Sequence, residues 1–276
     1  MDVHEKFDLK ELMSIDVPKE RVDRLSKLVK FDTTEELSEE VERYLLKEQV
    51  RYVNIQYARF LAGIKFKPEE VDELLEDAID IHAHGGSEPF ERIMLEDDIA
   101  IDYTRAKMKA VVIKTWYTPS ASRTALVQKI VDKWAAECGL RPVKVIGGIT
   151  LNYSVGGINP NAVERCLGFP NFKYVWMPMV DSYHHRKIVY DDQTGKGIRF
   201  IDENRKIIPE MREIFRIIAD NDFILASGHY PYEDTALLFE EAKKFGVKRM
   251  EIVHPAHIHS KHSIKQMKEA AQEGVK

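Results

Sequence analysis

The sequence predicts an α/β protein in which a (β/α) TIM-like barrel over residues 67–276 follows an N-terminal helical extension over residues 1–66. Two observations predict the barrel. From residue 78 onward, short apolar runs rich in β-branched residues alternate with helical stretches, as in parallel strands joined by helices. The runs are apolar along their length, which is typical of strands buried on both faces. No glycine-rich phosphate loop follows the first run, so we favour a barrel over an open doubly wound sheet.

The elements of the barrel can be placed from the same pattern. Strands are expected over 78–84, 110–113, 143–151, 174–180, 223–226 and 249–253, and helices over 122–137, 209–219 and 235–245. Gly139 and Gly246 stand where glycines end helices, and Asn159 before Pro160 has the pattern of an N-cap followed by a first-turn proline. A seventh strand would begin at 274–276, so the predicted barrel is incomplete at its C-terminus or closes differently.

The N-terminal extension reads as helical. Thr33 and Glu36 have the spacing of a capping box, and apolar residues then recur at helical intervals until Gly63, which predicts a helix over about 34–62. This helix carries four aromatic residues, more than a solvated helix normally does: Tyr44, Tyr52, Tyr57 and Phe60. We therefore expect it to pack on the main domain or on a partner chain, and we expect a homo-oligomer.

Composition excludes several classes of function. The net charge is −5, with 13 Lys and Arg against 20 Asp and Glu in residues 1–77 and 28 against 26 in the rest. Neither part concentrates basic residues, so we expect no nucleic-acid binding. No apolar run is long enough to cross a bilayer. The two cysteines form no C-x-x-C pair and no signal peptide is evident, so a reducing cytoplasm is expected.

A short histidine motif ends the first predicted strand. Side chains alternate along a strand, so Asp80, His82 and His84 share one face. Imidazole is the commonest metal ligand, and two imidazoles on one rigid strand need little ordering to bind one ion. Asp80 could orient an imidazole from behind. The plain alternative is an exposed strand end that happens to carry two histidines.

Other polar residues follow the remaining predicted strands. They are Lys114 and Trp116, then Asn152, then Asp181, Tyr183, His184 and His185, then His229, and finally His254. The carboxyl ends of parallel barrel strands meet at one mouth, so these side chains should gather there. A single histidine is more often structural than ligating. Six histidines at the strand ends of one barrel favour a metal site.

These motifs resemble the amidohydrolase superfamily of metal-dependent barrel hydrolases. The resemblance rests on His82 and His84 closing the first strand, with His229 and His254 closing the fifth and sixth. The stretches 147–152, 156–160, 175–178 and 227–229 are similar to an uncharacterised group of metal-dependent hydrolases within it. The resemblance implies a divalent ion, zinc first with manganese, iron or nickel as alternatives, held by those four histidines. It also implies a metal-activated water attacking an amide, lactam, ester or imine carbon of a small molecule.

The chain departs from that family at two places. Where the family often has a bridging lysine or glutamate after strand four, this chain offers Asp181 or the pair His184 and His185, which favours a single ion. The family's general-base aspartate after strand eight has no counterpart here. We expect Asp181, His184 or His185 to protonate the leaving group. Lys114 is expected to polarise the substrate, or simply to pair with a carboxylate.

The remaining predictions concern the substrate and the alternatives. Trp116, Asn152 and Tyr183 are expected to contact substrate, although loop packing would explain an aromatic residue equally well. Residues 187–208 are predicted to form a β-hairpin, as a lid over the mouth or as a decorated loop. His257, His259 and His262 are expected to be mostly solvated or to support the ligands. Two other functions stay open: a metal-dependent decarboxylase or lyase, and a catalytically silent barrel with a role in assembly.

Overall fold

The computed structural model describes residues 73–90, 92–257 and 260–276. All of them belong to the second of the chain's two units, Glu69–Lys276. The predicted extension over 1–66 and its helix over 34–62 lie outside the described residues, as does His259. No helix in the described part is long and apolar enough to cross a membrane.

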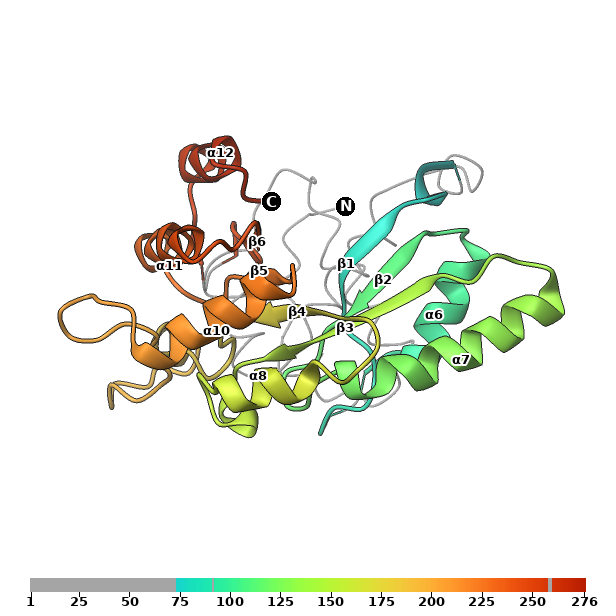
Figure 1. The fold of residues 1–276 in the computed structure, drawn as a ribbon, viewed down its shortest axis with the longest axis horizontal. Helices are drawn as coiled ribbons and strands as arrows, with labels where there is room; N and C mark the ends of the chain where they lie inside the picture. The colour runs from blue at the N-terminus through green and yellow to red at the C-terminus, as the bar shows by residue number, and fades with distance from the viewer. Residues whose placement is uncertain (1–72, 91, 258–259) are drawn as a thin grey trace, which may run out of the picture. The chain divides into compact units, whose positions relative to one another are not determined.

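Six parallel strands form one sheet in the order of the chain (Figure 1). They are β1 (Ile79–Ala83), β2 (Ala110–Ile113), β3 (Lys144–Thr150), β4 (Phe172–Trp176), β5 (Ile224–Ala226) and β6 (Arg249–Glu251). Each strand pairs with the next, and the order never reverses as it does in a doubly wound sheet. The sheet is curled into a half-barrel, so the α/β class is confirmed and the fold is compatible with a TIM-like barrel.

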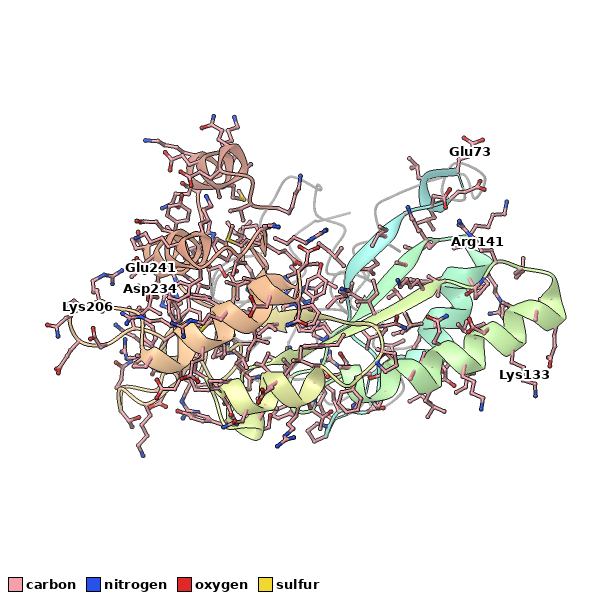
Figure 2. All side chains as sticks on the ribbon, in the orientation of Figure 1. Glu73, Lys133, Arg141, Lys206, Asp234 and Glu241 are labelled. Carbon is pink, nitrogen blue, oxygen red and sulfur yellow. The ribbon has the colours of Figure 1, made fainter. Side chains whose placement is uncertain are left out.

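Helices connect the strands. They are α6 (Glu96–Arg105), α7 (Ala121–Cys138), α8 (Pro160–Cys166), α9 (Tyr183–Val189), α10 (Pro209–Asp220), α11 (Tyr232–Lys244) and α12 (Ile264–Gln272), with a 3₁₀ turn, η1 (Tyr153–Val155), before α8. The expected signals are present at two of the helix ends. The Asn159 side chain accepts a hydrogen bond from the Ala162 amide at the start of α8, and Gly139 ends α7 at φ 67°. Figure 2 shows Lys133 pointing away from α7 into solvent.

The two faces of the sheet differ because side chains alternate along each strand. One face buries apolar residues such as Val111 and Val175 against the helices. The opposite face carries a second, smaller apolar cluster: Val112, Tyr174, Trp176, Met179, Ala226 and Val253. Lys114 follows Val112 on that face and Glu251 precedes Val253, and both are buried. Lys114 and Glu251 are therefore set into a largely apolar part of the half-barrel interior.

The predicted hairpin over 187–208 is wrong. Residues 183–189 form α9 instead, because the Ser182 hydroxyl accepts a hydrogen bond from the His185 amide and so caps a helix. Strand pairing in the described part of this segment is limited to isolated bridges, Ser182 with Ile198 and Ile201 with Ile207.

The fourth strand also ends earlier than predicted. β4 stops at Trp176, and Pro178 has no amide hydrogen with which to extend the ladder. As a result, His184 and His185 lie in the first turn of α9 and not at a strand end.

The last residue lies on the outer edge of β6. The Lys276 amide donates to the Met250 carbonyl at 3.0 Å, and the Lys276 carbonyl accepts from the Ile252 amide at 2.8 Å. In a parallel ladder, the amide and the carbonyl of one residue bond to the two residues that flank its partner on the neighbouring strand. Lys276 therefore pairs with β6 as the first residue of a seventh strand would.

Candidate functional site

The two histidines of β1 lie side by side. Alternation along the strand puts both rings on the same face, and Nε2 of His82 is 3.2 Å from Nε2 of His84. The sequence predicts that Asp80, one step earlier on that face, orients an imidazole, but its carboxylate has other partners. Its carboxylate accepts from the His82 backbone amide at 2.8 Å and from the Tyr103 hydroxyl at 2.6 Å, so it holds the strand in place.

Two cations flank the histidine pair. Nζ of the fully buried Lys114 is 3.1 Å from Nε2 of His82, and Nη2 of Arg92 is 3.2 Å from Nδ1 of His84. Arg92 also pairs with Glu88 at 2.5 Å, and the other oxygen of Glu88 accepts from the Trp116 amide. Sequence reasoning missed Glu88 and Arg92, for which the only available signal is an i, i+4 charge pair in a stretch without periodicity.

Arg92 fixes the hydrogen on His84. A guanidinium can only donate, so Nδ1 of His84 accepts and the hydrogen of its neutral ring is on Nε2. That Nε2–H group then donates to Nε2 of His82. Burial and the charges of Lys114 and Arg92 lower the pKa of His84, against a hydrogen bond between the His84 ring and the backbone of Lys114, which raises it.

Three further imidazoles extend from the pair into the interior. The His254 ring centre is 4.5 Å from that of His82 and 5.9 Å from that of His229, and Nδ1 of His229 is 2.8 Å from Nδ1 of His185. We call these five residues the histidine row: His84, His82, His254, His229 and His185. His254 has a left-handed backbone at φ 50°, a conformation that in non-glycine residues is often found at functional sites.

Burial favours the neutral form of four members of the histidine row. It holds the pKa values of His82, His84 and His254 well below their usual range, and the charge of Lys114 lowers them further. Burial likewise lowers the pKa of His185 to about 3, with a contribution from His257. Neutral imidazole is the form that binds metal.

The interior beside the row holds a lysine and a carboxylate. Burial lowers the pKa of Lys114 to about 7, against the charges of Glu251 and Glu88, which raise it. Burial raises the pKa of Glu251 to about 7, against a hydrogen bond from Tyr174 and the charge of Lys114. Nζ of Lys114 also lies 5.8 Å from the ring centre of Trp176. Glu251 was missed in the sequence, where a lone acid in an apolar run was the only signal.

The match to a known family covers this whole arrangement. A family model described as "Family of unknown function (DUF6282)" matches residues 77–276, which include every member of the histidine row. The chain belongs to this family. A comparison with curated proteins found no match. The resemblance to amidohydrolases therefore continues to rest on the motifs alone.

Solved structures add little to the family match. The DUF6282 chain is similar to a crystal structure of a mandelate racemase/muconate lactonizing enzyme, with 14% identity over 92% of this chain and 74% of that one. The TM-score of 0.27 is too low to support a conclusion about fold or chemistry.

Several predicted site residues of the DUF6282 chain lie outside the histidine row. Burial lowers the pKa of His184, and the charges that act on this ring come from residues outside the row: Asp234, Lys187, Glu233 and His262. The Tyr183 hydroxyl donates to Asp234 at 2.5 Å. The Asp181 carboxylate accepts from the backbone amide of the residue that opens η1, at 2.8 Å. Of the neighbouring histidines on α9, only His185 joins the row.

Asn152 and Trp116, which the sequence predicts to contact substrate, each have their own contacts in the structure. Asn152 is fully buried, and its amide donates to the Trp116 carbonyl at 3.0 Å and accepts from the Met179 amide at 2.9 Å. Both ends of the Asn152 amide are thus used to join three loops. The Trp116 ring lies beside the pair, 5.6 Å from the His84 ring and 5.7 Å from the Phe90 ring.

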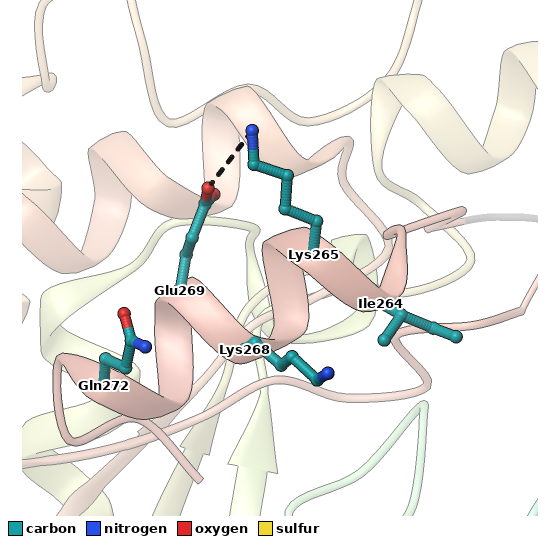
Figure 3. Close-up of a pocket in the computed structure, with 5 residues that line it drawn as sticks. All are labelled: Ile264, Lys265, Lys268, Glu269 and Gln272. Carbon is teal, nitrogen blue, oxygen red and sulfur yellow. Dashed lines mark ion pairs between the residues drawn. The ribbon is translucent and has the colours of Figure 1, made fainter.

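A hollow of about 500 Å³ lies along α12, away from these residues in sequence (Figure 3). Its lining consists of Ile264, Lys265, Lys268, Glu269 and Gln272. Lys265 and Glu269 form an exposed ion pair across one turn at 3.9 Å. None of the lining residues belongs to the histidine row.

Proposed function

We propose that the DUF6282 chain is a metal-dependent hydrolase that acts on an amide, lactam, ester or imine bond of a small molecule. One observation carries the proposal: two imidazole Nε2 atoms stand 3.2 Å apart on one strand, in rings that burial keeps neutral. The amidohydrolase-like motifs of the sequence agree with it.

The pair has the right spacing for one ion. Zinc–nitrogen bonds of about 2.0–2.1 Å place two ligating nitrogens roughly 2.9–3.4 Å apart. Among the residues that the structure describes, no three His, Cys, Asp or Glu side chains form a ready ligand group. The proposal therefore rests on His82 and His84, with His254 as the nearest further imidazole and His229 beyond it.

The tautomer of His84 must change before this ring can bind an ion. Its Nε2 becomes a ligand only when the hydrogen moves to Nδ1, and Arg92 cannot accept a hydrogen there. We therefore expect the contact between Arg92 and His84 to break when the site is loaded. Arg92 keeps its pairing with Glu88 in that event.

The chain's own residues would handle the protons. When bound, a divalent ion lowers the pKa of water from about 15.7 to near 7 and polarises the bond under attack. Lys114 and Glu251 both have pKa values of about 7, so either can exchange a proton at neutral pH. We assign Lys114 to the leaving nitrogen or oxygen because its Nζ lies next to the pair. We assign Glu251 to take the proton that the attacking water loses and to pass it back to Lys114, since the charges of the two groups act on each other.

The test is a hydrolysis assay on the full chain. Protein stripped with chelator and reloaded with zinc, manganese, iron or nickel would be tested against p-nitrophenyl esters, anilides and lactams. We expect turnover that needs the metal, disappears in His82→Asn and persists in His184→Asn. Turnover that survives both chelation and His82→Asn would contradict the proposal. The comparisons do not favour the decarboxylase or lyase alternative, for which carbon dioxide release is the readout.

A further inference from the structure

We infer that this site binds a carboxylate group of its ligand through the side chains of Arg92 and Trp116. The statement that the ligand is a substrate rests on the proposed function. The binding of a carboxylate does not, because it follows from two donors that have no hydrogen-bond partner among the described residues.

Arg92 is the first such donor. Its side chain is only 5% exposed, and its Nη2 donates to Glu88 and to His84. A carboxylate often accepts two parallel hydrogen bonds from one arginine. The second oxygen of Glu88 instead accepts from the Trp116 amide. Nε of Arg92 is consequently buried with no hydrogen-bond partner among the described residues.

Trp116 supplies the second donor. Its indole Nε1 is also buried and has no hydrogen-bond partner in the described part of the chain. The two side chains are neighbours, with Cζ of Arg92 5.2 Å from the Trp116 ring centre. Buried N–H groups are nearly always paired, so two unpaired ones next to a histidine pair point to an acceptor that comes from outside.

The chemistry of the two donors selects the ligand. Nε of Arg92 and Nε1 of Trp116 can only donate, so the group between them must only accept. A carboxylate has two oxygens for two donors, and its negative charge is favoured by Arg92 and by the buried Lys114. A neutral amide offers one acceptor oxygen in place of two and carries no negative charge. A phosphate would present a third oxygen, which these two donors leave without a partner.

Benzoate is a suitable probe because it joins a carboxylate to a flat apolar ring that can lie against Trp116 and Phe90. Calorimetric titration of the metal-free full chain should show benzoate binding about tenfold or more tightly than its neutral analogue benzamide, and more tightly than inorganic phosphate. Trp116→Phe keeps an aromatic ring and removes the N–H group. Arg92→Lys keeps the charge and removes Nε. Each variant should weaken benzoate binding by about tenfold or more.

The chain contains a matched control. Arg105 lies over the Trp134 ring at 5.1 Å on α6 and α7, in a pair like that of Arg92 and Trp116 but far from the histidines in sequence. Trp134→Phe and Arg105→Lys should leave benzoate affinity unchanged. If Arg92→Lys does not fold, Trp116→Phe alone decides.

Three results would overturn the inference: no benzoate binding, equal binding in Trp116→Phe, or a preference for phosphate. The readout needs neither metal nor turnover, so its failure is distinct from that of the hydrolase proposal. A chain that binds benzoate but no metal would refute the hydrolase alone.

Discussion

Lys114 is the residue on which the charges of the site depend. It is fully buried, its Nζ contacts His82, and its charge lowers the pKa values of three histidines while opposing the rise in that of Glu251. A buried ammonium is costly unless it is paired, and burial accordingly lowers its pKa from 10.5 to about 7.

This depressed pKa predicts how stability changes with pH. Between about pH 7 and 10.5 the unfolded chain holds a proton on Lys114 that the folded chain lacks, so folding becomes more favourable as pH rises through this range. Lys114→Met should therefore stabilise the metal-free protein at pH 6, by a few kcal/mol at most, and much less at pH 10. Urea unfolding at the two pH values measures the difference. An equal effect at both would contradict the assignment.

Some residues of the site could be predicted from the sequence, and others could not. The pairing of His82 and His84 follows from alternation along one strand, which is a local property, and the structure places their rings together. Arg92 and Glu88 could not be found in this way, because they lie in a loop whose path depends on tertiary contacts. The same limit separated His184 from His185, whose directions were set by a helix cap that had not been foreseen.

At the scale of elements, the ends of β4 and β5 are held in close contact. A side chain on Gly228 would overlap the Pro178 carbonyl oxygen, so only glycine lets the loop carrying His229 approach the end of β4. The His229 amide donates to that same carbonyl at 3.1 Å. Glycine at this position therefore sets where the fifth-strand histidine stands.

Gly228→Ala should destabilise the fold by about 1–3 kcal/mol, the usual cost of overpacking a tight contact. The loop that carries His229 would have to shift to make room. Gly168→Ala is the matched control, because that glycine is exposed and an added methyl group meets nothing closer than 3.9 Å. We expect the control to change stability by less than about 0.5 kcal/mol. Equal urea midpoints for the two variants would show that the contact is not tight.

At the scale of the whole molecule, alternation along the chain was enough to predict parallel strands joined by helices. The order of the six strands follows because each connection returns to the neighbouring position in the sheet. The hairpin prediction failed because residues 187–208 carry strand-like residues, while the Ser182 cap and packing select a helix at their start. The N-terminal extension remains a prediction, since it lies outside the described residues.

The histidine row makes the folded chain sensitive to acid. Burial lowers the pKa values of His82, His84 and His254 well below the ordinary 6.5 and that of His185 to about 3. It also lowers the pKa of the nearby His257, to about 4. The unfolded chain therefore binds more protons than the folded one below about pH 6.5, and stability falls as the pH falls toward 4. Urea unfolding at pH 7 and pH 5 should show a clear loss, smaller in His185→Asn. Unchanged stability between these pH values would contradict a buried, neutral row.

The most direct test of the account is the metal content of the full chain. Protein stripped with chelator, dialysed against zinc and then against metal-free buffer would be measured by elemental analysis, together with His82→Asn, His84→Asn and the control His184→Asn. The account predicts about one ion per chain in the parent and the control, and loss of the ion in both β1 variants while circular dichroism stays unchanged. An unmetallated parent, or about one ion per chain retained in both β1 variants, would contradict it.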